Sequence, residues 1–543
     1  MLPRKGNLLF IALICTSAGL TAQNTVGNEE VIVVKEYEAT IQDAQRVMLQ
    51  PSIPETETKT PVFEYQLPPA VLKNFAFEPN PLKPIALGKE KPEKHNQSYI
   101  LGGIGWHLNP LVQLVYNGRS TDKVRYGLHY RHYNMYSYRN RLQRFSDDAA
   151  GAYAEYFIKK SEIGASFNFQ NYRTHFYGLR TDTLAPDSVI KPKDARQVFR
   201  NYDGQVYFQN AQPNRAEIDY RQQVQFNYLQ EIYGKATEWF VAGNTDFGKK
   251  FMKHHRAGAH FDFDISLLKY DTFRLARNIF RFAAGYGFDN DDWEARAQIG
   301  MAVFGKKVFP LADIHLEKRL YEHSIVAYLS YRLRYEKNSL WRFAETNRFV
   351  YHNVPLINSS AGDFGTGLKG TAGKLTYDAA FHLLHVRQLP LFVNDTNDYS
   401  RFTVTYDSNS VIYNGHLEAG YQAKEWLRLS LAADYYHFVL RNQPHAWHEP
   451  NLRITLRTNY VWKNKISVSL DVYGLSSSKA LLRNDSTATI RGLADINLSA
   501  WYRMNKHLSF FLQLNNIGHF RYQRWYGYPS FGINGVAGVR FSF

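Results

Sequence analysis

Three residues in separate segments of the chain have the side chains of a hydrolytic triad. His129, Ser166 and Asp262 could supply the base, the nucleophile and the carboxylate that serine chemistry needs. That chemistry also requires the three side chains to meet within hydrogen-bonding distance. A chain with many polar positions brings such residues together by chance, so we interpret them as ordinary polar strand residues. We therefore expect no catalytic residue and no enzymatic activity.

Two histidine-containing segments could bind a metal ion. His254 is followed directly by His255, and the segment 445–449 holds His445, His448 and Glu449. A stable zinc site needs about four ligands at defined spacing. Neither segment has a third and a fourth ligand at such a spacing, so we interpret these residues as surface and turn histidines. The sequence predicts no metal site and no cofactor.

Charged residues also recur at every second position within segments that alternate between apolar and polar residues. Eight of them are our candidates for charges that line an internal water-filled space: Arg125, Arg131, Asp262, Asp264, Arg332, Arg428, Asp434 and Asp471. Such charges could select a solute by its own charge. Alternatively, they could neutralise one another as ion pairs between neighbouring strands. The sequence leaves both interpretations open.

A group of aromatic residues lies between the alternating segments. Its members are Trp341, Phe343, Phe349, Tyr351, Trp447, Trp525 and Tyr526. Aromatic residues in loops could bind a ligand or a protein partner. They could equally pack the loops against one another or contribute to an interfacial band.

The elements that must position all these residues are β-strands. In the segment 257–267, apolar residues occupy the odd positions, and His260, Asp262, Asp264 and Ser266 lie between them. The same alternation occurs in 163–170, 427–435, 466–472 and 508–515. A period of two residues indicates strands with one apolar face and one wet face.

The lengths of the alternating segments favour a membrane barrel over a soluble sandwich. They run for 9 to 14 residues, whereas sandwich strands average about 5–6 and a tilted membrane strand needs about 9–11. The sequence predicts short turns at 423–425, 463–465 and 504–507, and long loops at 135–148, 178–213, 337–356, 389–400, 441–450 and 475–488. Short turns at one end and long loops at the other are typical of outer-membrane barrels.

We therefore predict an all-β fold, a transmembrane antiparallel β-barrel with an extended Pro-rich N-terminal segment. Residues 98–543 are 446 positions. At roughly 20–25 residues per strand and connection, they form about 18–22 strands. The strand number should be even, because both ends of such a barrel lie on the same side of the membrane.

The overall composition agrees with this fold. The chain has 543 residues, 15% aromatic residues, one cysteine and a formal charge of +16. One cysteine cannot form a disulfide within the chain. The basic residues are scattered and form no stripe along a groove, so we expect no nucleic-acid binding. Beyond residue 22, no apolar run reaches the roughly 18–20 residues of a membrane-spanning helix.

The first 96 residues form two predicted segments. Arg4, Lys5 and the apolar run 8–14 are typical of a signal peptide, which we assign to residues 1–22. Removing it takes away Cys15 and two positive charges, so +16 becomes +14. Residues 23–96 form a periplasmic or lumenal segment in which 51–92 contains nine of the 20 prolines. Proline prevents a sheet there, and the barrel follows at 97–543.

The C-terminal residues carry the most specific signal. The segment 535–543 (GVAGVRFSF) alternates and ends on Phe543. A last amphipathic strand that ends in phenylalanine resembles the signal by which Gram-negative outer-membrane barrels are recognised by the barrel assembly machinery. We therefore single out Phe543 as the candidate assembly signal.

Several longer segments resemble the TonB-dependent receptors. The segment 514–543 is similar to the last two strands of these receptors. The segments 33–51, 98–134, 337–355 and 367–370 resemble receptor-like barrels without a plug domain. About 75 residues between the cleavage site and the first strand are too few for a standard plug. The segment 30–34 (EVIVV) superficially resembles a TonB box, which pairs with TonB by strand addition; a β-prone tether or lumenal segment is the alternative.

The resemblance implies a protein of the cell outer membrane that lets a solute pass. Its expected partners are outer-membrane lipid and lipopolysaccharide, the barrel assembly machinery, and TonB or another envelope protein. The alternative is a structural or assembly component of an outer-membrane protein complex.

Overall fold

A computed structural model of the chain describes residues 98–106, 109–121, 123–137, 140, 142–178, 193–212, 216–321, 324–482 and 485–543. The predicted signal peptide, the Pro-rich segment and the EVIVV segment lie outside the described residues. The first strand of the wall begins at Tyr99 and the last ends at Ser542.

Twenty-two strands form one antiparallel sheet. They are β1 (Tyr99–Gly105), β2 (Pro110–Thr121), β3 (Val124–Tyr136), β4 (Arg144–Ile158), β5 (Ser161–His175), β6 (Arg196–Asn210), β7 (Ile218–Glu231), β8 (Ala236–Phe251), β9 (His255–Tyr270), β10 (Phe273–Asp289), β11 (Trp293–Phe304), β12 (Lys307–Tyr321), β13 (Ile325–Glu336), β14 (Ser359–Ala372), β15 (Leu375–Asn394), β16 (Phe402–Lys424), β17 (Leu427–Val439), β18 (Leu452–Trp462), β19 (Ile466–Leu475), β22 (Leu493–Arg503), β23 (Leu508–Asn515) and β26 (Asn534–Ser542).

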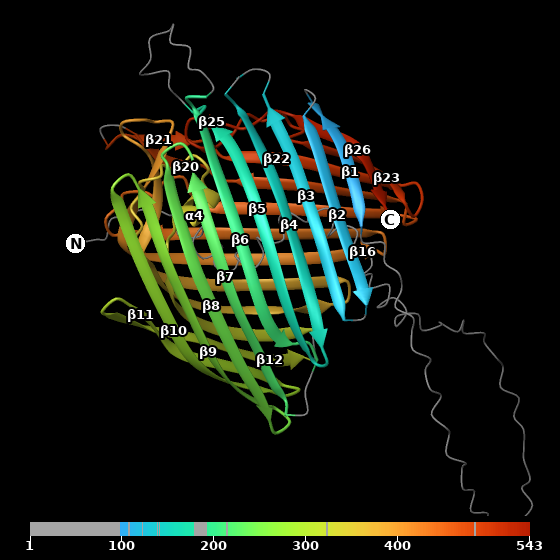
Figure 1. Ribbon diagram of the computed structural model, residues 1–543, viewed down its shortest axis with the longest axis vertical. Coiled ribbons are helices and arrows are strands. Elements are labelled where there is room, and N and C mark those ends of the chain that lie inside the picture. The colour runs from blue at the N-terminus through green and yellow to red at the C-terminus, as the bar shows by residue number, and fades with distance from the viewer. Residues whose placement is uncertain are drawn as a thin grey trace, which may run out of the picture. The chain divides into compact units, whose positions relative to one another are not determined.

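The sheet closes on itself between its first and last strands. β1 pairs with β26 from Tyr99↔Ser542 to Gly105↔Val536, and every other wall strand pairs with its neighbours along the chain. Figure 1 shows these strands side by side around the wall. The predicted antiparallel barrel is confirmed, and its 22 strands are an even number within the predicted range.

The alternation predicted for 257–267 explains how the wall separates its two faces. β9 pairs with β10 and β8 over its length without a change of register. Phe261, Phe263 and Ile265 therefore share one face, while His260, Asp262 and Asp264 share the other. Ion pairs of His260 and Asp262 with Asp246 and Arg281 lie on this second face.

The first face carries an apolar outer belt. Large exposed apolar side chains occur on it all around the barrel, among them Leu128, Phe167, Val206, Phe226, Phe282, Ile299, Leu329, Leu368, Leu417, Leu456 and Leu512. Trp293, Trp426, Trp462 and Tyr502 are also exposed and lie at the ends of strands. Exposed apolar surface of this extent requires lipid, so the fold is a transmembrane barrel of the outer-membrane type.

Connections at the two ends of the barrel differ in length. One end has the turns 122–123, 159–160, 211–217, 252–254, 290–292, 322–324, 373–374, 425–426, 463–465 and 504–507; we call it the short-turn end. The other, the long-loop end, has the connections 106–109, 137–143, 176–195, 232–235, 271–272, 305–306, 337–358, 395–401, 440–451, 476–492 and 516–533.

Three predicted loop boundaries are wrong. The predicted loop 135–148 includes the end of β3 and the first five residues of β4, because β4 begins with polar residues that hide the alternation. The predicted loop 178–213 contains β6, because Arg200 and Gly204 share a face with Val206 and Phe208 and so hide the apolar alternation. The predicted loop 389–400 contains the end of β15, which continues to Asn394.

Three small elements lie in the long loops. The helix α4 (Leu340–Thr346) begins at Ser339, whose side chain accepts a hydrogen bond from the backbone N–H of Arg342. The hairpin β20 (Ser478–Leu481) and β21 (Thr487–Ile490) lies between β19 and β22, and β24 (Gln523–Trp525) and β25 (Tyr528–Pro529) lie between β23 and β26. Among the described residues, no helix is both long and apolar enough to cross a membrane.

Candidate functional site

The eight charges predicted to line a lumen lie on the face opposite the outer belt. Seven of them form ion pairs or a charge-assisted contact with another side chain of the wall. Examples are Arg131 with Asp147 at 2.5 Å and Arg332 with Asp313 at 3.0 Å. The other pairs are Arg125–Glu155, Asp262–Arg281, Asp264–Lys337, Asp434–His416 and Asp471–Arg457. Arg428 makes no ion pair with any described residue.

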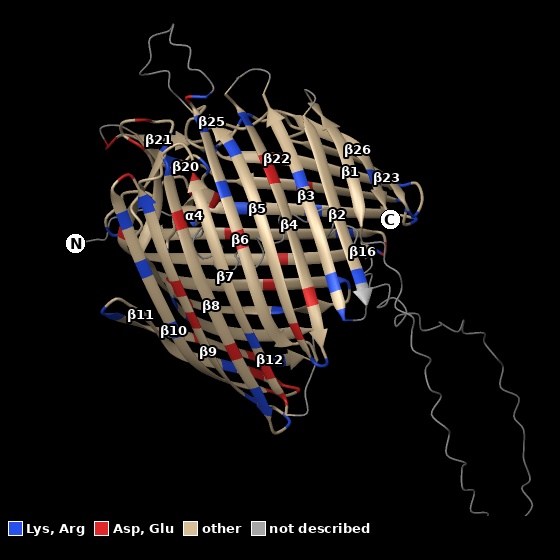
Figure 2. Ribbon diagram, viewed as in Figure 1, with Lys and Arg blue, Asp and Glu red and all other residues tan. Residues whose placement is uncertain are grey.

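Seven of the eight candidate charges are therefore paired. This agrees with the alternative that such charges neutralise one another as ion pairs between neighbouring strands. Figure 2 shows acidic and basic segments interspersed along the strands. Most of the eight candidate charges are thus balanced by a neighbouring group on the wall. Whether these residues select a solute remains a prediction.

The residues of the supposed triad do not meet. His129 on β3 lies opposite Gly151, which in turn lies opposite Asn168, whereas Ser166 on β5 lies opposite Tyr153. Asp262 on β9 is six strands from His129 and is engaged with His260 and Arg281. The described residues also contain no group of three or more side chains that could hold a metal ion.

A layer of loop residues crosses the long-loop end of the barrel. We call it the mouth layer; it consists of 337–358 with α4, the hairpin tip 389–407, the loop 440–451 and the loop 516–533. Its apolar core joins Leu340, Phe343 and Val350 to Trp525 and Tyr528. The same cluster includes Phe199, Leu229 and Leu268 of the β6–β9 wall and Phe392, Phe402 and Val404 of the β15–β16 hairpin.

Aromatic contacts show that the mouth layer spans the whole barrel. Tyr177 is the second residue beyond β5, and Phe402 is the first residue of β16. These strands are 11 positions apart (16 − 5) in a ring of 22, so they stand on opposite sides. The ring of Tyr528 contacts both, at 4.8 Å from Tyr177 and 5.9 Å from Phe402. The ring of Phe349 stacks on Tyr528 at 3.6 Å.

The hairpin tip reaches this position because the β15–β16 ladder is interrupted. Pairing stops at Arg387↔Asn409 and resumes at Leu389↔Asp407. Gln388, in the gap, has a φ of +58°, which a side chain other than glycine rarely adopts. Beyond this point, Leu389 to Asn394 are all buried. Burial on both faces means that the tip leaves the lipid-facing wall and lies within the mouth layer.

Buried ion pairs attach α4 to the wall. Glu238 on β8 pairs with Arg277 on β10 at 3.2 Å, and both side chains are buried. Glu238 also accepts a hydrogen bond from the backbone N–H of Trp341, and Arg277 donates to the carbonyl of Asn338. Glu238 and Arg277 therefore keep these backbone hydrogen bonds only while the segment 337–341 stays in place, and losing them would leave two buried charged groups short of partners.

A second set of polar contacts holds the loop 440–451. The carboxylate of Asp407 accepts hydrogen bonds from the backbone N–H groups of Arg441, Asn442 and Gln443. Glu449, whose side chain is fully buried, pairs with Arg453 and with Arg524. These contacts link the loop to the hairpin tip, to β18 and to β24.

The histidine of this loop is also buried. His448 Nδ1 contacts the carbonyl oxygen of Phe392 at 3.1 Å, and Arg524 donates to the carbonyl of His448. Burial, together with the positive charge of Arg524, lowers the pKa of His448 to about 3. His448 is therefore a neutral packing residue of the mouth layer, and Glu449 beside it is committed to arginine partners.

Arg401 links its own loop, 395–401, to three other loops of the long-loop end: 176–195, 232–235 and 337–358. It pairs with Asp398 at 3.0 Å, and its guanidinium lies over the rings of Phe176, Tyr233 and Tyr351 at 5.1, 4.4 and 4.8 Å. Each such contact stabilises by about 0.5–2 kcal/mol. Noncovalent contacts of this kind can be broken and re-formed.

The loop aromatics predicted as possible ligand contacts belong mainly to this layer. Phe343, Trp447 and Trp525 are buried, and Trp341, Phe349 and Tyr351 are partly buried against the core. They pack loops together, which was the alternative interpretation. Sequence reasoning missed Glu238, Arg277, Asp407 and Arg401. For Asp407 and Arg401, the available signal was the length of the strands around 375–424, which exceeds what a membrane crossing needs. No local signal marks Glu238 and Arg277.

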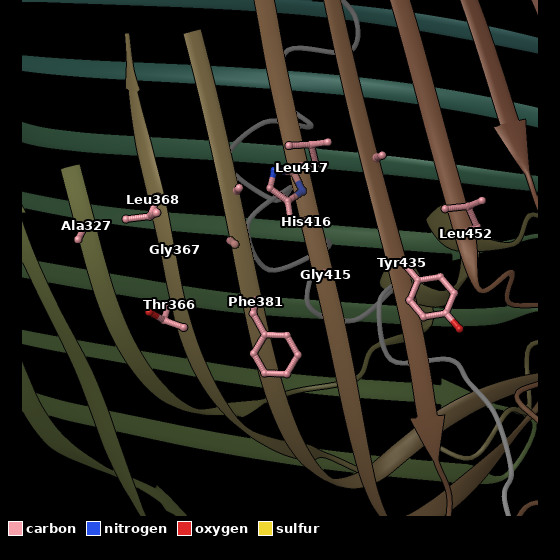
Figure 3. A pocket seen from close by; sticks show the side chains of 13 residues that line it. Ala327, Thr366, Gly367, Leu368, Phe381, Gly415, His416, Leu417, Tyr435 and Leu452 are labelled. Carbon is pink, nitrogen blue, oxygen red and sulfur yellow. The ribbon is translucent and has the colours of Figure 1, made fainter. Parts of the chain in front are cut away.

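A hollow of about 630 Å³ lies elsewhere, on the lipid-facing side of β13–β18. Figure 3 shows Leu368, Phe381, Leu417 and Tyr435 around it. These residues belong to the outer belt, and small residues such as Gly415 form its floor. The hollow is thus separate from both the lumen wall and the mouth layer.

The fold is similar to those of known outer-membrane receptors. The FrpB iron transporter from Neisseria meningitidis has a TM-score of 0.65 and 11% identity, covering 82% of this chain and 81% of that chain. The ferric-catecholate import receptor Fiu from E. coli has a TM-score of 0.62 and 10% identity (83% and 82%). The pyoverdine receptor FpvA from Pseudomonas aeruginosa has a TM-score of 0.62 and 12% identity (82% and 78%).

Comparisons by sequence found no match, either among protein-family models or among curated proteins. At these identities the structural similarity concerns the fold alone. The predicted resemblance to TonB-dependent receptors is confirmed for the barrel fold.

Proposed function

We propose that the protein lies in the outer membrane and lets a solute pass through its barrel, with the mouth layer as the gate at the long-loop end. The main support for this proposal is that Tyr528 contacts both Tyr177 and Phe402, which come from strands on opposite sides of the barrel. A layer that spans a wide polar lumen controls what enters it. The structurally similar proteins are named as iron transporters and siderophore receptors, which supports transport but does not identify the solute.

The long-loop end would face the outside of the cell, since outer-membrane barrels have long extracellular loops and short periplasmic turns. The segment 23–96 would then lie on the periplasmic side or within the lumen, where TonB or another envelope protein could engage it. The eight predicted lumen charges would line the path below the gate. Their pairing favours a hydrated path over one strongly selective for a single charge sign.

Planar-bilayer conductance tests the proposal. We would compare the mature chain with a variant in which 340–356 is replaced by a short Gly–Ser linker, a variant without 23–96, and a variant with both changes. Because α4 contributes the centre of the mouth layer, the double variant should conduct with large stable openings. The mature chain should remain mostly closed.

A matched control replaces the turn 463–465 by a Gly–Ser linker of the same length, because this turn lies at the short-turn end, away from the mouth layer. It should leave conductance unchanged. Folding of every variant is checked by heat-modifiable gel mobility. If the folded double variant stays closed, solute passage is refuted, and a stable co-purifying envelope protein would then support the structural alternative.

A further inference from the structure

Four arginines form a patch on the outer face of β4, β5 and β6 near the long-loop end. They are Arg144, Arg173, Arg196 and Arg200, and we call them the outer arginine patch. β4 pairs with β5, and β5 with β6, without any change of register. Strict alternation therefore puts all four on the same face as Phe167 and Val206 of the outer belt.

The register also gives the height of the patch. Phe169 and Tyr202 lie opposite each other, with ring centroids 5.0 Å apart, and extend the belt upward with an aromatic row. Two residues closer to the long-loop end, the next pair on the outer face is Asn171 with Arg200. The rows above contain Arg173 and then Arg196. Each row is about 7 Å along the strand, so the patch begins where an aromatic interfacial girdle ends.

The arginines of the patch lack carboxylate partners. None of the four forms an ion pair among the described residues, in contrast to Arg131 on the inner face of the adjoining strand β3. Arg173, Arg196 and Arg200 are exposed. Figure 2 shows basic segments toward the upper ends of β5 and β6.

Neighbouring polar groups do not neutralise the patch. Arg144 Nε donates to Nε2 of His175 at 3.2 Å, so His175 accepts as a neutral imidazole. Asp148 is the nearby carboxylate on the outer face, and it is engaged by His132 at 2.5 Å and by Asn171. Four like charges held within a few strand positions favour binding of a polyvalent anion.

We propose that the outer arginine patch binds the phosphate groups of a lipid headgroup in the leaflet on the long-loop side. Planar guanidinium groups match phosphate oxygens in bidentate geometry. The patch adjoins Phe167, Phe169 and Val206, against which acyl chains of the same molecule would lie. The inference needs the barrel to lie in a membrane, but it does not depend on solute passage.

Lipid A with two phosphates, and lipid A from which both have been removed, are the probes. Native mass spectrometry of the detergent-purified full chain measures how many molecules of each remain bound. The test variant carries Arg144→Gln, Arg173→Gln, Arg196→Gln and Arg200→Gln. The wild type should retain the phosphorylated form, and the test variant should bind it at least about tenfold more weakly, because each lost charged contact is worth more than 1 kcal/mol.

The matched control removes four other positive charges near the long-loop end: Lys269→Gln, Arg274→Gln, Lys307→Gln and Arg387→Gln. It should bind the phosphorylated lipid as the wild type does. Equal weakening in both quadruple variants would show general charge attraction and overturn the proposal. Equal retention of the dephosphorylated lipid by the wild type would overturn it too, since acyl contacts alone would then suffice. Heat-modifiable mobility confirms that each variant is folded.

Discussion

Individual buried polar residues hold the mouth of this barrel. Glu238 with Arg277, and Glu449 with Arg453 and Arg524, are ion pairs whose members come from different loops or strands. Removing one partner of such a pair leaves a buried charge without compensation, which costs more than the pair itself contributes. The stability of the mouth layer therefore depends on a few identifiable side chains.

Substituting Glu449→Gln should loosen the loop 440–451. The change takes the carboxylate away from Arg453 and Arg524, which are themselves partly exposed, so we expect a cost of about 1.5–3 kcal/mol to the local structure. Hydrogen exchange followed by mass spectrometry should show faster exchange in peptides from 440–451 and 521–526. The control is Glu425→Gln, which changes an exposed carboxylate in a short turn. Unchanged exchange in the Glu449→Gln protein would contradict the role of this pair.

His448 should make the mouth layer less stable in acid. Its pKa is about 3 in the folded loop, against an ordinary value near 6.5. The opened loop therefore binds a proton that the folded loop excludes, and stability falls as the pH decreases from about 6.5 toward 3. We expect opening of 440–451, corrected for intrinsic exchange rates, to increase over this range.

The variant His448→Gln isolates this effect. Glutamine can still donate to the carbonyl of Phe392 but does not titrate, so the pH dependence of opening should become shallower. Glu345 in α4 acts in the opposite sense, because burial raises its pKa to about 7. Its contribution is lost as the pH rises from about 4.5 to 7. An identical pH profile in the wild type and in His448→Gln would refute the assignment to His448.

The strands of the wall differ in how far they extend. Most strands cross the membrane, whereas β15 and β16 continue beyond it, and the interruption at Gln388 turns their tip into the mouth layer. β1 and β26 close the ring with seven paired positions. This seam depends on a close approach of the two backbones, because Gly103 lies opposite Gly538.

Substituting Gly538→Ala should weaken the seam. A Cβ atom at this position would lie 2.1 Å from the carbonyl oxygen of Gly102, which is backbone and cannot move aside alone. We expect destabilisation of roughly 1–3 kcal/mol, typical of overpacking. The measurement is the fraction of refolded protein with heat-modifiable mobility.

Gly102→Ala is the matched control in the same seam, since its Cβ would meet no atom within 4 Å. It should refold like the wild type. Equal yields from the two variants would show that the close approach at Gly538 is not important for closure.

At the scale of the whole molecule, a ring of 22 strands combines lipid contact outside with paired charges inside. The described barrel needs no contribution from other chains to close. Its last residue contributes little to that closure. The backbone N–H of Phe543 donates to the carbonyl of Ser98, while the residue as a whole is 44% exposed.

Deleting Phe543 should therefore impair assembly in cells much more than it affects the folded barrel. The deletion removes one backbone hydrogen bond and a half-exposed residue, so melting of the purified folded protein should change little. The amount of folded protein in the outer membrane should fall several-fold if Phe543 is the assembly signal. Wild-type amounts in the membrane would count against this prediction.

The sequence by itself determined the wall. Alternation in segments such as 257–267 depends only on the two-residue period of a strand and on the difference between lipid and water, so the strand faces could be predicted. The even strand number followed from the barrel type, and a lumenal role for the eight candidate charges stays a prediction. The partners of those charges could not, because pairing depends on register. Register links Arg131 to Asp147 and Asp262 to Arg281 only once neighbouring strands are aligned.

Only the tertiary structure determined how the loops pack in the mouth layer. Residues 389–394 were predicted as a loop because no local pattern marks a strand that leaves the wall. For Trp447 and Trp525 the sequence left ligand binding and loop packing open, because their neighbours are far away in the sequence. Tyr177, Phe349, Phe402 and Tyr528 meet only after the ring has closed and brought strands from opposite sides within reach of one layer. Contacts made across a closed ring have no local sequence signature.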